Sequence, residues 1–492
     1  MTNDNLNIDY DLLFGSDSGE DEDPNALRSY FVDLPEFKKF YDATKPLAIV
    51  RGRKGMGKSA LLKRLAIRLA DANGAKDIVI ETTGNELIGM GDFSGADQAY
   101  LENHWKQVIC KRICVEIGKR INFAVTDNTM SMVEASEIEG FKGSNVVSAL
   151  TERIGGLLQK LIPGADSGDS PSGENAKILK KGISNHIQAL KSFQLVKDRT
   201  VWILIDDIDA KYIDNEANQQ RVGAFFSAIR SLAFSVKGIK IRASVRTDVW
   251  RNLRKMEDQD KIRDYVIDIH WKDQALKSIF AKRILSYLQR ENFGPAATWN
   301  TTMNYDAIVA QVFVNRFLWD NKYLEPFIPI KILAGNRPRW MGQLCKLAGG
   351  HAGKAKIEAS HVNLAMKEFG QEKISDIQKE HIHQFSDLPK VTDIFRSGKR
   401  EYNRFQLDSL INKEYVEKAG GDVPLVNGYP YLGADQIADF LFQIDFLSAH
   451  HVGKSDFVSF QDDPDLFGSN ENKQNKLMWT INASYRNYLR IT

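Results

Sequence analysis

The chain has 492 residues, of which 43% are hydrophobic and 26% are charged, which is enough for several cores. Its 66 Lys and Arg residues and 64 Asp and Glu residues give a formal net charge of +2, so no strong overall field directs it to nucleic acid or anionic lipid. Three cysteines supply no disulfide framework, and the sequence contains neither an apolar signal segment nor a run long enough to span a membrane. These features exclude disulfide-rich secreted proteins and membrane-spanning proteins, and they predict a cytoplasmic protein.

The beginning of the chain is strongly acidic. Eight Asp and Glu residues precede Arg28, the first basic residue. Like charges in a block repel one another and keep a segment solvated. We therefore predict a flexible acidic arm over residues 1–26.

A glycine-rich loop follows a short apolar run at residues 46–50, which is typical of a buried parallel strand. The loop reads Gly-Arg-Lys-Gly-Met-Gly-Lys-Ser over residues 52–59, and apolar residues at helical spacing follow from Ala60. Strand, glycine-rich loop and helix are the setting of a Walker A motif. The sequence therefore predicts a nucleotide-binding loop at this position.

The residue types of this loop suit a triphosphate. Backbone N–H groups and the positive end of the following helix face the phosphate charges, and glycines let the main chain curl closely around them. Lys58 is predicted to reach the β- and γ-phosphates, and the Ser59 hydroxyl to ligate Mg²⁺. The predicted nucleotide-binding residues are Gly52, Arg53, Lys54, Gly55, Met56, Gly57, Lys58, Ser59 and Ala60.

Paired acids follow a second apolar run at residues 201–205, in the manner of a Walker B strand. Asp206 is predicted to hold Mg²⁺ together with Ser59, and Asp207 to orient or deprotonate the attacking water. Asp209 lies two residues further on and can share that role, so the choice between Asp207 and Asp209 stays open. The alternative is a strand that simply runs into an acidic turn.

A third polar strand end is Ser244-Val245-Arg246, followed closely by Asp248. Ligands of open α/β sheets lie at the carboxyl ends of the strands, so Ser244 or Arg246 could approach the γ-phosphate. The alternative is a structural turn in which Arg246 pairs with Asp248.

Two further arginines flank Pro338, which is typical of the first turn of a helix. Arg337 and Arg339 oppose the dipole at that end of the helix, and an anion between them would resolve the conflict. We predict that one of them contacts the γ-phosphate. The alternatives are a surface position or pairing with a carboxylate.

These motifs define the expected organisation. We predict an α/β P-loop NTPase domain over residues 27–270, with a parallel sheet and a helical insertion at about 84–198; the resemblance described below implies its ASCE/AAA+-like character. The insertion should contain a helix near 146–161 and a low-complexity loop at 163–173. A helical lid domain over residues 271–392 should follow.

The last part, residues 393–492, is predicted to be a winged-helix-like domain. A helical segment at 435–446 precedes two short β-like runs at 457–460 and 478–481, which we expect to form a hairpin. The domain carries 11 Lys and Arg against 14 Asp and Glu residues, a net charge of −3. A DNA-reading module normally has a basic face, so this charge favours protein partners.

Taken together, the motifs resemble those of the AAA+/STAND branch of P-loop ATPases, and more narrowly of bacterial ATPases in phage-defence and other conflict systems. The resemblance includes residues 18–22 with 30–32 before the loop, the two Walker motifs, Asn336 to Arg339 and, near the end, 482–486. It implies ATP and Mg²⁺ as cofactors, a helical lid and assembly into a homo-oligomer. In conflict systems such an ATPase often regulates a separate toxin or nuclease.

Two functions of different class therefore compete. The first is an ATP-hydrolysing regulatory switch that assembles and controls a partner effector, since the sequence shows no zinc set, nuclease motif or nucleophile elbow of its own. The alternative is a DNA-dependent ATPase of the initiator or loader kind. A basic stretch could serve as a DNA path or a subunit interface; it contains Arg242, Arg246, Arg251, Arg254, Lys255, Lys261 and Arg263.

Overall fold

The structure is a computed structural model that describes residues 8–16, 19, 21–73, 77–88, 97–120, 190, 200–209, 212, 215–253, 259–319, 321–453 and 457–491. Its first unit is a five-stranded sheet with the order β2-β3-β4-β1-β5, in which every neighbouring pair is parallel. All five strands therefore end at the same edge. The strands are β1 (Leu47–Arg51), β2 (Ile78–Thr83), β3 (Val201–Asp206), β4 (Ile239–Val245) and β5 (Val266–Asp268).

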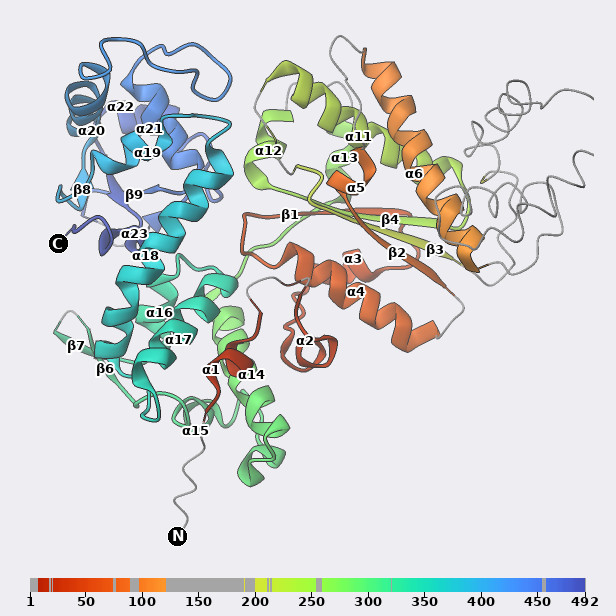
Figure 1. Cartoon of the computed structure of the whole chain (residues 1–492), viewed down its shortest axis with the longest axis horizontal. Helices are drawn as coiled ribbons and strands as arrows, with labels where there is room; N and C mark the ends of the chain where they lie inside the picture. The colour runs from red at the N-terminus through yellow and green to blue at the C-terminus, as the bar shows by residue number, and fades with distance from the viewer. Residues whose placement is uncertain are drawn as a thin grey trace, which may run out of the picture.

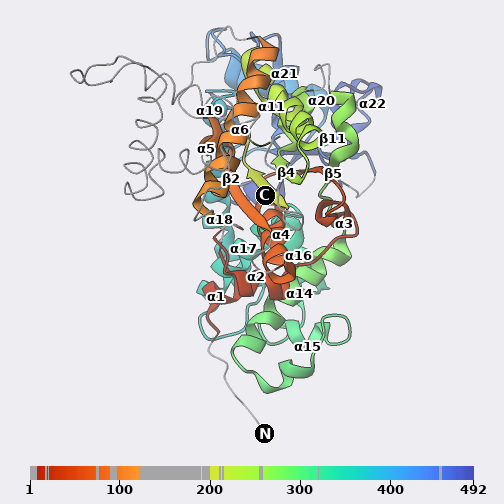
Figure 2. The same cartoon turned by 90° about the vertical axis from the view of Figure 1, so that its right-hand side faces the viewer.

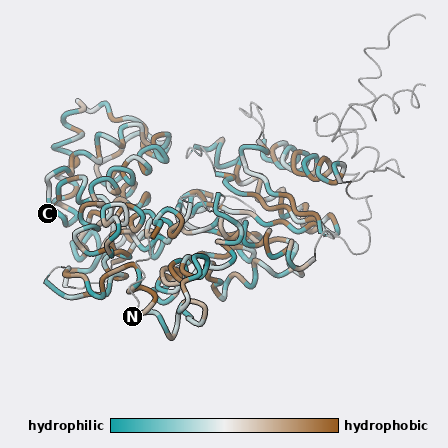
Figure 3. Tube along the Cα trace, turned by 60° about the horizontal axis from the view of Figure 1, so that its bottom comes forward, coloured by the Kyte–Doolittle hydropathy of each residue, from teal (hydrophilic) through white to brown (hydrophobic). Residues whose placement is uncertain are grey.

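Helices cover both faces of this sheet (Figure 1). Ile203 and Ile205 of β3 belong to the core on one face, whereas Trp202 and Leu204 belong to the core on the other. A strand buried on both sides needs a continuous apolar run, and residues 201–205 of β3 form one; brown, hydrophobic stretches alternate with teal ones along the trace in Figure 3. The α/β P-loop NTPase fold is confirmed. One face carries α6 (Gln98–Arg120) and α11 (Glu216–Ser235); the other carries α3 (Phe37–Tyr41) and α4 (Lys58–Asn73).

The expected helical insertion is described only at its beginning and end. After β2 come α5 (Gly84–Ile88) and α6, which packs along α11. The predicted helix near 146–161 and the predicted loop at 163–173 lie outside the described residues.

The next unit is mainly helical, as predicted, but a β-hairpin interrupts it. The hairpin joins β6 (Phe317–Trp319) and β7 (Lys322–Leu324). Phe317 is fully buried, and its cross-strand partner is Leu324. The helices are α14 (Asp273–Arg290), α15 (Tyr305–Val309), α16 (Phe327–Leu333), α17 (Pro338–Ala352) and α18 (Ala359–His381).

The last unit combines helices with an antiparallel sheet of order β10-β9-β11-β8. The predicted hairpin between residues 457–460 and 478–481 is wrong, because β10 and β11 do not pair but flank β9 on its two sides. Leu447 and Ala449 of β9 face the core, yet its other residues are Ser and His, which give a weak strand pattern. The elements are α19 (Leu388–Asp393), β8 (Glu401–Tyr402), α20 (Arg404–Ile411), α21 (Ala434–Gln443), β9 (Leu447–His451), β10 (Phe457–Val458), β11 (Leu477–Ile481) and α23 (Ala483–Arg486).

The acidic beginning of the chain differs from the flexible arm that its charge predicts. Residues 8–16 and 21–26 lie on the protein, where α1 (Tyr10–Phe14) and α2 (Pro24–Tyr30) pack beside α14 and α17 (Figure 2). The acids work as helix caps: Asp9 accepts from the Leu12 N–H and Asp23 from the Ala26 N–H. Two acids of this block, Asp9 and Asp23, therefore serve backbone groups of their own helices, although the charge of the block predicts a solvated arm.

One continuous hydrophobic core joins the lid to the C-terminal unit. It contains residues from α1, from helices α14 to α18 and from the C-terminal sheet, for example Phe14, Trp340 and Trp479. A shared core makes these two units move together, because separating them would expose apolar surface. Within the described residues no helix has the length and apolarity to cross a membrane, and all three cysteines are free.

The basic stretch expected as a DNA path or subunit interface does not form a continuous surface. Arg242 is fully buried, where it lies over the Trp202 ring and donates to backbone carbonyls before β1. Arg246 is paired with acids inside the protein. Arg251 and Arg263 each form an ion pair with a nearby Asp. Residues 254 and 255 are not described.

A pH-dependent contact lies between α20 and α21. Burial and the neighbouring Asp435 raise the pKa of Asp408 to about 7, against the opposing charge of Arg404. A carboxyl group whose pKa is higher in the folded than in the unfolded chain contributes its full stabilisation when the pH is below its pKa in the unfolded chain, which is near 4. That stability is lost as the pH rises through 7.

We therefore expect Asp408→Asn to raise the thermal midpoint relative to the wild type at pH 8, by at least about 2 °C, and to have less effect at pH 5. Differential scanning calorimetry at both pH values measures this, with the exposed Asp422→Asn as the matched control. An equal shift at both pH values would contradict the raised pKa.

Candidate functional site

The phosphate loop lies between β1 and α4, at the carboxyl edge of the sheet. Gly55 and Gly57 have φ values of 81° and 91°, in the left-handed region that glycine adopts most readily. The Gly52 N–H donates to the Val245 carbonyl of β4 at 3.3 Å, and the Trp271 indole donates to the Met56 carbonyl at 2.9 Å. The predicted strand, loop and helix are therefore present, with the loop fixed on both sides.

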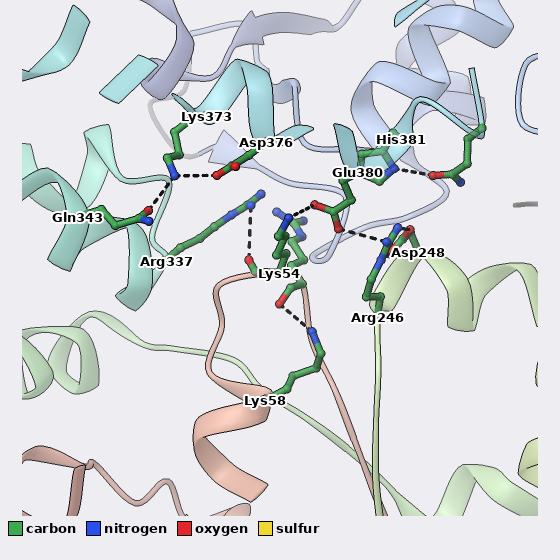
Figure 4. Close-up of polar contacts among 12 residues, drawn as sticks. Lys54, Lys58, Arg246, Asp248, Arg337, Gln343, Lys373, Asp376, Glu380 and His381 are labelled. Atoms are coloured by element: carbon green, nitrogen blue, oxygen red, sulfur yellow. Dashed lines mark hydrogen bonds and ion pairs between the residues drawn. The ribbon is translucent and has the colours of Figure 1, made fainter. Parts of the chain in front are cut away.

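Lys58 is the first residue of α4 and is 8% exposed. Its ammonium donates to the Arg53 carbonyl across the loop, at 3.3 Å (Figure 4). The amino group thus lies within the curl of the loop, where phosphate oxygens are expected.

The two acids of the Walker B strand end have different surroundings. One Asp206 oxygen accepts from the Ser244 hydroxyl of β4 and from the Asp207 N–H, and its other oxygen accepts no hydrogen bond within the described residues. Asp207 is exposed, with a left-handed backbone at φ 49°. The Ser59 hydroxyl and the Asp206 carboxylate supply the hard oxygen donors that Mg²⁺ prefers, so these residues fit the expected ion.

Asp209 lies apart from the loop cavity. It is fully buried, and one oxygen accepts from the Arg246 N–H at 2.6 Å while the other has no partner. Burial raises the pKa of Asp209, although the charges of Arg246 and Lys58 oppose this. Asp207, by contrast, lines the cavity, so the geometry favours Asp207 as the acid that faces a ligand.

A cavity of about 190 Å³ lies over the phosphate loop. Its lining brings together parts of the chain that are far apart in the sequence. It includes Gly55, Lys58 and Ser59 of the loop region, Asp207 after β3 and Arg339 of α17, with Trp271 beside them. Loop, acid and lid arginine therefore face one space.

Another part of the cavity wall comes from the beginning of the chain, part of which the charge pattern predicts to be flexible and part of which the resemblance includes. The lining residues there are Ser16, Gly19, Glu22, Leu27, Tyr30, Phe31 and Val32. The Tyr30 hydroxyl donates to the buried Glu22 carboxylate at 2.8 Å, and the Arg283 guanidinium of α14 lies 4.4 Å over the Tyr30 ring. Lys63 of α4 donates to the Glu22 carbonyl at 2.7 Å. This wall is thus held by both the ATPase unit and the lid.

The two arginines beside Pro338 lie in different places. The predicted helix start is confirmed, because α17 begins at Pro338 with Arg337 as its N-cap. Arg337 is 6% exposed and pairs with Asp445 at 2.5 Å, so the anion beside it is a carboxylate. Arg339 lines the cavity, and its guanidinium forms no hydrogen bond or ion pair among the described residues.

Arg246 is paired as the structural alternative predicts. It forms ion pairs with Asp248 and, at 3.2 Å, with Glu380 near the end of α18 (Figure 4). Burial would lower the pKa of Arg246, but these two acids outweigh it and raise the pKa above its usual range. Glu380 also pairs with Lys54 of the phosphate loop at 3.3 Å.

Glu380 and Asp445 are the residues that sequence reasoning missed. Burial would raise the pKa of Glu380, but Arg246, His381 and Lys54 lower it to about 2, so it is ionised throughout the physiological range. Asp445 joins Arg53 of the loop, at 2.6 Å, to Arg337. Glu380 lies in a mixed polar stretch of α18 and Asp445 just after the apolar helix α21, and neither setting indicates which cation the acid pairs with.

Neither protein-family models nor curated proteins match the sequence. Among solved structures, a Walker-type ATPase of Pyrococcus abyssi is similar at 14% identity, with a TM-score of 0.40, and covers 96% of this chain and 100% of its own. The ORC2 protein of Aeropyrum pernix, in ADPNP and ADP complexes, is similar at 11% identity and a TM-score of 0.38, over 94% of this chain and 90% of its own. Cdc6p of Pyrobaculum aerophilum is similar at 12% identity and a TM-score of 0.30, over 95% and 98%. These TM-scores carry no argument about function, which rests on the site itself.

The two arginines should differ sharply in their effect on stability. Arg337→Met leaves Asp445 with one of its two buried partners, and we expect a loss of about 3 kcal/mol in the free energy of unfolding. Arg339→Met removes no hydrogen bond or ion pair among the described residues and should change the free energy of unfolding by less than about 0.5 kcal/mol. Urea denaturation followed by tryptophan fluorescence compares them, and equal losses would contradict the buried pairing.

Proposed function

We propose that the chain binds ATP with Mg²⁺ and hydrolyses it. The observation that carries this proposal is the single cavity in which the phosphate loop with Lys58, the acid Asp207 and the arginine Arg339 face one another. Binding of a triphosphate needs hydrogen-bond donors and positive charge along its phosphates, and its hydrolysis needs a carboxylate beside the terminal phosphorus to position the water. This cavity offers all three.

The residues divide the work by position. The loop N–H groups and Lys58 would bind the β- and γ-phosphates, and Ser59 with Asp206 would hold Mg²⁺, which supplies charge neutralisation there. Asp207 would orient the attacking water and accept its proton. Arg339 would contact the γ-phosphate, since it lines the cavity and its guanidinium has no ion pair or hydrogen bond within the described part of the chain. Arg246 and Arg337 act indirectly, because acids already hold them.

Two variants separate binding from hydrolysis. Lys58→Ala should weaken ATP binding by at least about 30-fold, because a charge-assisted contact contributes about 2 kcal/mol or more. Asp207→Asn should keep ATP affinity within about twofold but lower kcat by about 100-fold or more. Calorimetric titration with ATP and Mg²⁺ and a phosphate-release assay measure the two effects.

Asp209→Asn is the comparison for the acid, because Asp209 is buried outside the cavity. Hydrolysis that survives in Asp207→Asn and disappears in a folded Asp209→Asn would reverse the assignment of the two acids. Wild-type affinity in Lys58→Ala would contradict the nucleotide site itself.

We further propose that the protein is a cytoplasmic switch that assembles on ATP binding and controls a separate effector, in the setting of anti-phage defence. The structural support concerns the switch: Glu380 of the lid and Asp445 of the C-terminal unit both pair with the phosphate loop, and these two units share one core. A change in the loop thus has a route to the C-terminal unit, which we interpret as winged-helix-like. The defence setting rests on the sequence resemblance.

The alternative is an ATPase that acts on nucleic acid. Fewer basic side chains are available to bind nucleic acid than the sequence suggests, because Arg242 is buried and Arg246 is paired with acids. Binding to DNA requires exposed positive charge against the phosphate backbone. We therefore favour a protein partner.

The purified protein should form an oligomer of higher molar mass when ATP and Mg²⁺ are added, and it should leave plasmid DNA and RNA intact. Multi-angle light scattering with ATP, ADP and no nucleotide measures the mass, and gel electrophoresis follows the nucleic acid. A monomer under every condition would contradict assembly, and cleavage by the pure protein would contradict a separate effector. Stimulation of hydrolysis by DNA of about tenfold or more would favour the alternative.

A further inference from the structure

Asp445 connects three parts of the chain. Its carboxylate pairs through one oxygen with Arg53 of the phosphate loop, at 2.6 Å, and through the other with Arg337 at the start of α17, at 2.5 Å. Asp445 itself follows α21 in the C-terminal unit and is 4% exposed. An ionised carboxylate this well buried is stable only with close counter-charges, and both of its partners belong to the candidate site or border it.

The first turn of α17 rests on the phosphate loop beside this pair. The Arg337 guanidinium donates to the Lys54 carbonyl at 3.5 Å, and the Arg339 N–H donates to the Gly55 carbonyl at 3.4 Å. The same turn carries the Arg339 side chain into the lining of the cavity. The position of Arg339 relative to the loop therefore depends on how this turn is held.

The carboxylate is needed because its two partners are both cations. Arg53 and Arg337 repel each other. The negative charge of Asp445 lies between them and attracts both guanidinium groups, which offsets that repulsion. Without it, the turn of α17 and the loop would be pushed apart at the point where Arg339 meets the cavity.

The backbone at Asp445 makes a conservative test available. Asp445 has φ 67°, and the Phe446 N–H beyond it donates to the Leu441 carbonyl at 2.9 Å to close the end of α21. Asn adopts this left-handed conformation as readily as Asp and has nearly the same shape. Asp445→Asn therefore removes the charge and leaves the turn in place.

We propose that Asp445 is a positioning residue of the nucleotide site, which holds the first turn of α17 on the phosphate loop and so fixes Arg339 against the terminal phosphate. This inference rests on the proposed ATP site. It assigns to the C-terminal unit a direct part in distinguishing ATP from ADP, since Arg339 faces the third phosphate and contributes little to the first two.

The test measures the affinity for ADP and for the imido analogue of ATP, each with Mg²⁺, by calorimetric titration. The wild type should prefer the analogue, and Asp445→Asn should lower that preference about tenfold while ADP affinity stays within about twofold. Arg339→Ala should lower the preference by a similar factor. The double variant should match Arg339→Ala alone, because both changes remove the same contact. Asp422→Asn is the matched control and should behave like the wild type.

Two further measurements cover a variant that does not fold. Arg337→Gln breaks the same bridge but leaves Asp445 paired with Arg53, and it should lower the preference in the same way. Hydrogen exchange of the wild type needs no variant: residues 441–448 and 337–341 should gain protection with the imido analogue and less with ADP.

The outcomes separate the two proposals. A wild type that binds neither nucleotide overturns the ATP site and this inference with it. A wild type that binds both, with a preference that survives in Asp445→Asn or Arg337→Gln, overturns the inference alone. Losses that multiply in the double variant also overturn it, because Asp445 would then act independently of Arg339.

Discussion

Three cations crowd the phosphate loop, and each needs oxygen partners of its own. The Lys58 ammonium remains inside the curl, on the Arg53 carbonyl, where it is available to a ligand. The side chains of Arg53 and Lys54 pair instead with Asp445 and Glu380, acids from much later in the chain. A buried cation without a counter-charge destabilises a protein by several kcal/mol. Where the C-terminal unit lies against the loop and covers Arg53, Asp445 therefore supplies the counter-charge that the covered guanidinium needs.

The shared hydrophobic core of the lid and the C-terminal unit gives those acids fixed positions. Glu380 lies near the end of α18 and Asp445 just after α21, and both elements contribute to that core. Apolar packing is not directional, so it sets the general placement of these helices, whereas the ion pairs select the register. Arg246 adds a link of the same kind, since Glu380 binds it and Lys54 at once. The site thus depends on packing that lies outside the parallel sheet.

The parts that sequence reasoning predicts are local, and those it misses are pairings between distant residues. The glycines of the loop, the apolar strand before Asp206 and the helix start at Pro338 each follow from a few adjacent side chains. The role of Arg246 could not be resolved in this way, because γ-phosphate and Glu380 are both anions and the sequence does not say which is nearer. The acidic beginning of the chain shows a related difference at its described residues. Asp9 and Asp23 cap helices, and in the sequence a capping acid has the same appearance as a solvated one. Only the backbone geometry distinguishes the two.

Ion pairs between separately packed parts are well suited to transmit a change of ligand, because such interfaces have discrete alternative arrangements and do not deform continuously. Lys58 and Arg53 illustrate the route. In the proposed site a triphosphate would compete with the Arg53 carbonyl for the Lys58 ammonium, and the guanidinium of that same Arg53 is held by Asp445. Coupling of this kind is reciprocal. A partner that binds the C-terminal unit and shifts Asp445 must therefore change the retention of the nucleotide by the same factor as the nucleotide changes the binding of that partner.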